Sequence, residues 1–114
     1  MKKYVGSYMA NEWSVLVEDG KDTRALDPCL DVRNHSPTGF AWGYGGSGPA
    51  QLAIALMCDV FGKPKSEEEL LSLHPVHYQE FKYDFIARLE MRQSWSITEE
   101  GIRSIVERLR RRTV

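Results

Sequence analysis

The stretch Pro49-Ala50-Gln51-Leu52-Ala53-Ile54-Ala55-Leu56-Met57-Cys58 decides the fold, because from Leu52 to Cys58 it is apolar on every face of a helix. Pro49 suits the first helical position, where its missing N–H costs nothing, and Gly62 suits the end of the helix. A helix that is apolar all round is usually buried all round. We therefore predict a buried central helix that begins at Pro49 and ends before Gly62.

The first 27 residues predict a small antiparallel sheet. Residues 4–9 and 13–18 alternate along the chain, with Trp13, Val15 and Val17 on one face of the second strand. Asp19-Gly20 is typical of a two-residue hairpin turn, and a third strand follows at about 21–26. Three strands with one apolar face need a cover, which the later helices supply.

Three further helices are expected after the central one. Ser66 with Glu69 forms a capping box that opens a short helix to about Leu73. A helix from Pro75 has one broad apolar face, and a last helix is capped by Thr98. The apolar positions of these two helices are Tyr78, Phe81, Phe85, Ile86 and Leu89, then Ile102, Ile105, Val106 and Leu109. Strands followed by helices predict one α+β domain over residues 1–114, a three-stranded sheet packed against about four helices.

Composition excludes several classes of protein. The chain has 114 residues, with 42% hydrophobic, 27% charged and a net charge of −1, so a wholly basic nucleic-acid-binding protein is not expected. No apolar run reaches the length of a membrane span, and the start of the chain does not resemble an export signal, which indicates a cytoplasmic protein with no membrane partner. Residues 103–112 hold five arginines and Glu107; they contact phosphates, or they form a solvated helix end.

Neither the cysteines nor the histidines predict a metal site or a cofactor. Cys29 and Cys58 lie far apart in no CxxC pair, so we expect two reduced, partly buried thiols. His74 and His77 are three residues apart, but a zinc site needs at least three protein ligands and no third one is near in the sequence.

The long irregular segment between the sheet and the central helix is the candidate functional region. Residues 39–48 hold five of the nine glycines together with Phe40, Trp42 and Tyr44. Amides of residues 45–48, just before a helix, are placed to converge on an anion, and the helix dipole adds to the attraction. No Lys-Ser/Thr pair follows the last glycine, as a P-loop requires, and no strand leads in with the spacing of a dinucleotide motif.

Upstream residues add partners for an anionic, ring-bearing ligand. Arg33 is able to pair with a phosphate or carboxylate, and His35 to exchange a proton near neutral pH. Trp42 or Tyr44 is able to stack on a ring. The candidate ligand-binding residues are therefore Arg33, Asn34, His35, Trp42, Tyr44, Gly45, Gly46, Ser47, Gly48 and Gln51, with no residue assigned as catalytic. The structural alternative is a loop folded over the sheet with Phe40 and Trp42 in the core, Arg33 paired with Asp27 or Asp31, and His35 bonded to the backbone.

The run W-G-Y-G-G-S-G-P-A-Q-L-A, here Trp42–Ala53, resembles the hallmark of a small family of domains of unknown function. Tyr78–Lys82 is similar to the family's second short motif and Trp95–Thr98 to its third, so the resemblance extends from about Tyr4 over nearly the whole chain. It implies a short protein of the kind that bacteria, plasmids and phages carry. It implies no activity, cofactor or catalytic residue, and Ala41 stands where family members often have an acidic residue.

Three functional hypotheses follow. The first is a cytosolic protein that binds an anionic, nucleotide-like small molecule at the glycine-aromatic segment. The second is a protein-interaction module of a phage or mobile element that acts on a host complex, with the exposed aromatics as anchors. The third is a hydrolase with His35 as general base, which needs a second acid or a metal that the sequence does not supply; an enzyme is therefore not the favoured reading.

Overall fold

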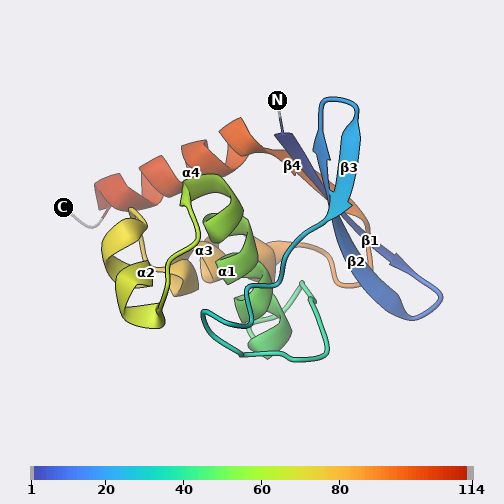
Figure 1. Ribbon diagram of the computed structural model, residues 1–114. Coiled ribbons are helices and arrows are strands. Elements are labelled where there is room, and N and C mark those ends of the chain that lie inside the picture. The colour runs from blue at the N-terminus through green and yellow to red at the C-terminus, as the bar shows by residue number, and fades with distance from the viewer. Residues whose placement is uncertain (1, 113–114) are drawn as a thin grey trace.

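A computed structural model describes residues 2–112 of the chain, and its strands form one sheet beside a group of helices (Figure 1). The sheet is antiparallel throughout, in the order β3-β2-β1-β4. A 3-10 turn, η1 (Ile86–Arg88), stands between the last two helices. The other elements are β1 (Lys2–Met9), β2 (Glu12–Asp19), β3 (Asp22–Ala25), α1 (Ser47–Phe61), α2 (Glu67–Leu73), α3 (Tyr78–Asp84), β4 (Trp95–Thr98) and α4 (Glu99–Arg112).

The fold is α+β as predicted, but the sheet has a fourth strand that the sequence pattern did not indicate. β4 pairs with β1, and Trp95 stands directly opposite Gly6. The indole ring of Trp95 lies over Gly6, where a Cβ atom would approach it to 2.2 Å. Four residues are too few for a clear alternation, so this strand depends on a partner far away in the sequence.

The sequence predicted the second of the two hairpin turns but not the first. Between β1 and β2 the turn is Ala10-Asn11, both with positive φ (53° and 64°), which the sequence analysis did not single out. Asp19 pairs with Asp22, so the second turn is Gly20-Lys21, one residue later than expected. Gly20 has a φ of 64°, a left-handed conformation that glycine adopts without strain.

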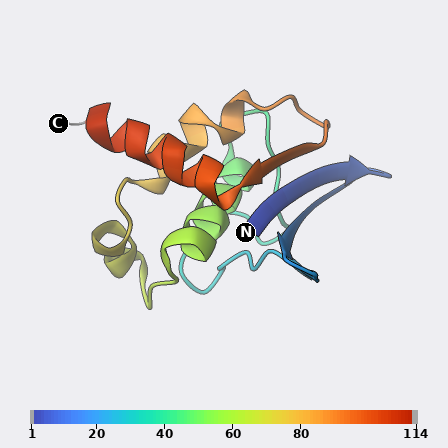
Figure 2. The same ribbon diagram turned by 90° about the horizontal axis from the view of Figure 1, so that it is seen from above.

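α1 is buried as predicted and begins two residues earlier than expected, at Ser47. α1 packs against α3, η1 and α4. Figure 2 shows that α4 continues from β4 and crosses α1. The inner face of the sheet adds Tyr4, Val15 and Val17 to this core. Among residues 2–112, no helix is long and apolar enough to cross a membrane.

The helix expected from Pro75 to Leu89 is in fact two pieces. α3 begins after His77, whose Nδ1 accepts from the amide of Gln79 at 3.0 Å, and it ends at a bend at Phe85. The carbonyl of Ile86 accepts a hydrogen bond from the amide of Gly43 at 3.0 Å, a partner outside any helix. The predicted caps at Ser66 and Thr98 are confirmed by hydrogen bonds from the amides of Glu69 and Gly101.

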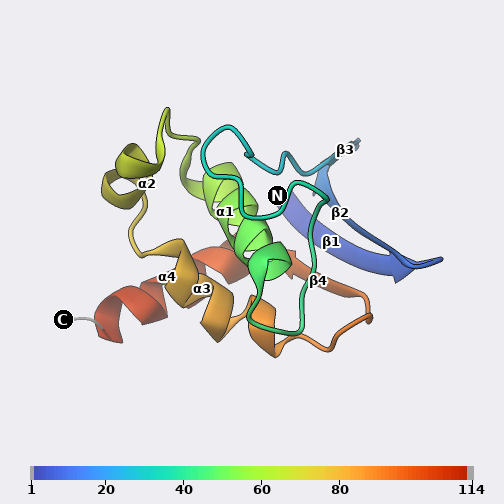
Figure 3. The same ribbon diagram turned by 90° about the horizontal axis from the view of Figure 1, so that it is seen from below.

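The segment 26–46 runs along α1, from Cys29 beside the C-terminal half of the helix to the N-terminal end at Gly46 (Figure 3). It therefore brings most of the residues singled out from the sequence close to the start of that helix.

Candidate functional site

Gln51 holds the segment before α1 in place and uses all of its hydrogen-bonding capacity to do so. The side chain is fully buried. Its Nε2 donates to the carbonyls of Pro28 (2.5 Å) and Arg33 (3.0 Å), while its Oε1 accepts from the amides of His35 (2.8 Å) and Ser36 (3.1 Å). No capacity is left for a ligand. Gln51 is therefore a structural residue, and we remove it from the candidate binding set.

Trp42 belongs to the core and not to an open site. It is fully buried, and its Nε1 donates to the carbonyl of Gln93 at 3.0 Å. The ring makes edge-on contacts with Trp13 (centroids 4.7 Å apart) and Trp95 (5.5 Å). The expectation that this ring stacks on a ligand is corrected, because neither face is free to do so; the structural alternative holds for Trp42.

Arg33 and His35 point to partners within the protein. Arg33 pairs with Glu67 of α2 at 2.7 Å, and not with Asp27 or Asp31. His35 Nε2 lies 2.6 Å from the hydroxyl of Tyr78. Burial, then the charges of Arg33 and Lys82, lower the pKa of His35, which keeps the ring neutral. Asn34, which lies between them in the sequence, is exposed to solvent.

The N-terminal end of α1 has free amides. Gly46 is the N-cap and offers no side-chain hydrogen bond, and the first turn of the helix contains no acidic residue. Within residues 2–112, the main-chain amides of Ser47 and Gly48 donate to no acceptor. Unsatisfied amides at a helix start carry a partial positive charge that attracts anions.

A hollow of about 240 Å³ opens at this helix end. Hydroxyl groups and aromatic rings share its wall: Trp13, Ser36, Thr38, Gly39, Phe40, Ala41, Tyr44, Ser47 and Gly48. Trp13, Ser36 and Thr38 were not among the residues singled out. Trp13 is on β2, and no local pattern connects that strand to the helix start. Four predicted residues remain near the hollow or on its wall: Tyr44, Gly46, Ser47 and Gly48.

Close packing accounts for two of the glycines in this segment without any ligand. Gly43 has a φ of 89°, and a Cβ atom there would lie 2.7 Å from the backbone of Met91. At Gly48 a Cβ atom would lie 2.7 Å from that of Ala41. The glycines therefore allow the segment to lie against its neighbours, and close packing does not account for the free amides at its end.

Lys82 is a buried cation close to the same segment. Only 4% of the residue is exposed, and its Nζ donates to the carbonyl of Gly45 at 3.4 Å while lying 4.1 Å from the ring centre of Tyr83. Among the described residues it has no carboxylate partner. Lys82 comes four residues after Tyr78 and so lies on the same face of α3. That spacing could have predicted that Lys82 is buried, but the sequence analysis considered only the apolar residues of this face.

Two exposed tyrosine rings lie over the glycines, Tyr44 against Gly46 and Tyr83 against Gly45, and the backbone and Cβ of Met91 lie against Gly43. All three are among the large apolar residues that the protein exposes to solvent. Tyrosine and methionine are both enriched in protein interfaces.

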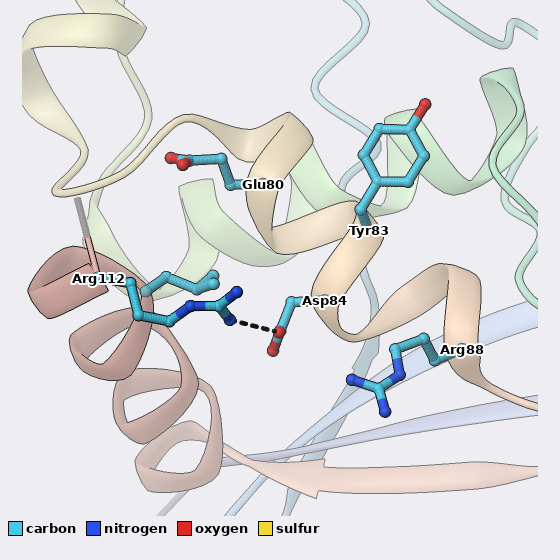
Figure 4. Close-up of a pocket in the computed structure, with 6 residues that line it drawn as sticks. Glu80, Tyr83, Asp84, Arg88 and Arg112 are labelled. Carbon is cyan, nitrogen blue, oxygen red and sulfur yellow. Dashed lines mark ion pairs between the residues drawn. The ribbon is translucent and has the colours of Figure 1, made fainter.

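A second hollow, of about 440 Å³, lies between α3 and α4 (Figure 4). Asp84 stands in it, accepts a hydrogen bond from Arg108 and forms an ion pair with Arg112 of α4 at 3.5 Å. Arg88 points toward the same hollow (Figure 4). Arg110 and Arg111 pair with Glu107. Arg108, Arg110, Arg111 and Arg112 are therefore engaged within the protein, which favours a solvated helix end over a phosphate-binding tail.

No group of three or more His, Cys, Asp or Glu side chains suited to a metal ion occurs within residues 2–112. The model of one protein family, described as a family of unknown function (DUF6166), matches residues 4–108. No curated protein and no solved structure matches the chain.

Proposed function

The chain belongs to DUF6166, a family of unknown function, and we propose that this member binds a small anionic molecule, with a ring beside its charged group, at the N-terminal end of α1. The observation that carries the proposal is the pair of unpaired amides, Ser47 and Gly48, at the edge of a hollow. A helix of 15 residues without a side-chain cap or an acidic first turn leaves its positive end to solvent or to a ligand.

The charge around this end of the helix supports an anion rather than a cation. Lys82 places a buried ammonium beside Gly45, and burying a charge whose partners are a carbonyl and an aromatic ring, without a carboxylate among the described residues, is costly. A bound anion would offset part of that cost through space. The wall of the hollow contains no acidic side chain that would repel it.

The shape of the hollow limits the ligand. At about 240 Å³ it holds a phosphate or carboxylate together with about one ring, so a phosphorylated sugar fits within it and a nucleoside monophosphate extends beyond its wall. Phe40 and Tyr44 supply the aromatic wall in place of the buried Trp42, and the hydroxyls of Thr38 and Ser47 are available to sugar or phosphate oxygens. We therefore propose a nucleoside monophosphate or a phosphorylated sugar as the ligand class.

The test uses a variant that removes one amide and leaves the helix intact. Ser47 is the first residue of α1, a position that favours proline, and the extended backbone of Gly46 accepts a following proline. Ser47→Pro deletes the amide donor, whereas the matched control Ser47→Ala deletes only the hydroxyl. Titration with adenosine monophosphate, followed by calorimetry and by amide NMR, is expected to show binding that Ser47→Pro weakens about tenfold and Ser47→Ala much less.

Two results would overturn this proposal. The first is that neither adenosine monophosphate nor inorganic phosphate shifts the amide resonances of Ser47 and Gly48 at millimolar concentration. The second is that Ser47→Pro binds as tightly as the unchanged protein while retaining its fold by circular dichroism.

A second candidate function, a protein-interaction module, is supported by three exposed apolar residues next to glycines of one segment, Tyr44, Tyr83 and Met91. Such side chains serve as anchors when a partner buries them. Given the expected occurrence of such proteins in phages and plasmids, the partner we propose is a protein complex of the host cell.

Affinity capture of the tagged protein with quantitative mass spectrometry tests this second function. A stoichiometric partner should disappear with the double variant Tyr83→Ser/Met91→Ser and persist with Leu71→Ser, which changes an exposed apolar residue of α2. Recovery of no stoichiometric partner, or of the same partner with the double variant, would count against it.

A further inference from the structure

Cys29 and Cys58 meet at the opposite end of α1 from the proposed ligand site. Cys29 follows β3, and Cys58 lies in the C-terminal half of α1. Both are buried, with 3% and 4% of the residue exposed, and both are free thiols. They line one small hollow of about 70 Å³ together with Ala55, Asp27, Asp59 and Lys63.

The backbone around Cys29 is held in an unusual conformation that places its side chain in this hollow. Cys29 has a φ of 58°, a left-handed conformation that strains a residue with a Cβ atom. Its amide donates to Asp27 Oδ1 at 2.9 Å, and its carbonyl accepts from the amides of Val32 (3.0 Å) and Arg33 (3.3 Å). These contacts stabilise a strained position where glycine or asparagine would be easier to accommodate.

The two thiols are chemically unequal. A hydrogen bond from the thiol of Cys58 lowers the pKa of Cys29, against burial and the charges of Asp27 and Asp31, and the nearby charge of Lys63 adds to the lowering. The same hydrogen bond, together with burial, raises the pKa of Cys58. Cys29 is therefore the sulfur that more readily becomes a thiolate, and Cys58 is the partner that keeps its proton.

We propose that Cys29 and Cys58 form a redox modification site, in which a small peroxide converts the two thiols into an intramolecular disulfide. The Cys29 thiolate attacks one oxygen of hydrogen peroxide, the O–O bond breaks, and the departing hydroxide takes up a proton to become water. Cys29 is then a sulfenic acid. The sulfur of Cys58 attacks the Cys29 sulfur, the S–O bond breaks, and the proton of Cys58 leaves in a second water molecule. Two thiols and one peroxide thus give one disulfide and two waters.

The size of the hollow selects the oxidant. A space of about 70 Å³ admits a molecule of the size of one or two waters, so hydrogen peroxide fits. A tripeptide disulfide such as oxidised glutathione does not fit beside two buried sulfurs. The product joins the segment after β3 to α1 covalently, so it should also raise the thermal stability of the protein.

The experiment treats the reduced, folded protein with hydrogen peroxide or with the same concentration of oxidised glutathione. Peptide mapping without reduction should detect a Cys29–Cys58 link, with loss of two hydrogens from the intact mass and an increase in Tm. Glutathione should form it at least tenfold more slowly. Intermolecular dimers alone, no cross-link with peroxide, or equal rates with both oxidants would overturn the proposal.

Single variants assign the order of the two steps. Cys58→Ser should accumulate a Cys29 sulfenic acid that dimedone traps, whereas Cys29→Ser should leave Cys58 largely unmodified. Lys63→Gln, an exposed change that leaves both thiols in place, should slow the reaction of the otherwise unchanged protein severalfold. Faster trapping at Cys58 than at Cys29, or no effect of Lys63→Gln, would contradict the proposed roles.

Discussion

The hydroxyl of Tyr4 donates a 2.6 Å hydrogen bond to the carboxylate of Asp59 and so joins β1 to the C-terminal end of α1. The same carboxylate accepts from Arg24 of β3 at 2.7 Å and from Lys2 at 3.2 Å. Burial raises the pKa of Asp59, but the hydrogen bonds from Tyr4, Arg24 and Lys2 together bring it below its usual value. One side chain of α1 thus holds two strands of the sheet against the helix.

Replacing Asp59 by asparagine should destabilise the protein by about 2–3 kcal/mol. The asparagine keeps the shape, but it leaves two cations and a phenol without the charge that they surround, in a place where the Asp59 side chain is only 13% exposed. Urea unfolding measures the loss. The matched control is Asp31→Asn, an exposed carboxylate paired with Lys63, which should leave the free energy of unfolding nearly unchanged.

The lowered pKa of Asp59 also predicts how stability depends on acid. In the unfolded chain the carboxyl of Asp59 has a pKa of about 3.9, and its pKa in the folded protein is lower. The unfolded state therefore takes up a proton first as the pH falls. The stability that the ionised Asp59 contributes is fully present above the unfolded pKa, and it is lost as the pH falls through the folded pKa. Unfolding measured from pH 6 down to about pH 2 should show this loss for the unchanged protein and a smaller one for Asp59→Asn. Equal slopes would contradict it.

Gln51→Ala should destabilise the protein by about 3 kcal/mol and loosen the segment 26–46. The variant removes four hydrogen bonds and leaves the backbone groups of residues 28, 33, 35 and 36 without a side-chain partner. Hydrogen exchange at the amides of His35 and Ser36 should accelerate strongly. The control Gln93→Ala removes an exposed amide side chain, while the main-chain carbonyl that receives Trp42 remains. Unchanged exchange at both amides would show that other contacts hold the segment.

Gln51 also illustrates where sequence reasoning reaches its limit. The all-apolar run around it predicts α1, and the alternation of Trp13, Val15 and Val17 predicts β2, because both patterns are local and repeat. A polar residue within such a run suggests a role, but whether it binds a ligand or the protein's own backbone depends on the segment 26–46. That segment has no period of its own, and its path is set by contacts with residues far along the chain. For the same reason Trp42 could be assigned either to the core or to a site.

The sequence indicated the free amides at the start of α1, but it did not indicate the residues that form the wall of the hollow beside them. Glycines before a helix indicate free amides, and Ser47 and Gly48 have them. Trp13 of β2 and the buried Lys82 of α3 come from elements whose position relative to α1 is a tertiary property. β4 was missed for a related reason, because its four residues become a strand only when Gly6 of β1 accommodates Trp95.

Two histidines predict a loss of stability at mildly acidic pH. Burial lowers the pKa of His74, although its hydrogen bond to the Gly62 carbonyl opposes this, and burial with the charges of Arg33 and Lys82 lowers that of His35. The Gly62 carbonyl, 2.9 Å away, requires the proton of His74 on Nε2. A second proton would go to Nδ1, which is buried and has no partner among residues 2–112.

Histidines in the unfolded chain have a pKa of about 6.5, and those of His35 and His74 are lower in the folded protein. The unfolded state therefore binds protons first, so acid favours unfolding. Stability should be level above that pH and should fall as the pH drops below it. His74→Gln keeps a donor for the Gly62 carbonyl and does not titrate, so its unfolding free energy should fall less between pH 7 and 5. His77→Asn, which keeps an acceptor for the Gln79 amide, is the control and should follow the unchanged protein. A His74→Gln profile as steep as that of the unchanged protein would assign the acid sensitivity elsewhere.

Gly6→Ala should destabilise the protein by about 1–3 kcal/mol, which is more than a methyl group on a strand normally does. The new Cβ would lie 2.2 Å from the indole of Trp95. That ring has little freedom to move, because it packs edge-on against Trp42 (5.5 Å) and Phe85 (6.0 Å). Near-ultraviolet circular dichroism should register its displacement together with the lower free energy of unfolding.

A double-mutant cycle separates this steric effect from a general preference of the strand. Trp95→Leu removes the ring that the methyl group meets, so Gly6→Ala should cost much less in that background, with a coupling of about 1 kcal/mol or more. Ser7→Ala, the next residue of β1 on the other face, should change stability by less than about 0.5 kcal/mol. If the two substitutions at positions 6 and 95 are additive, the indole does not lie over Gly6 in solution, and the pairing of β4 with β1 would have to be shifted along the strand.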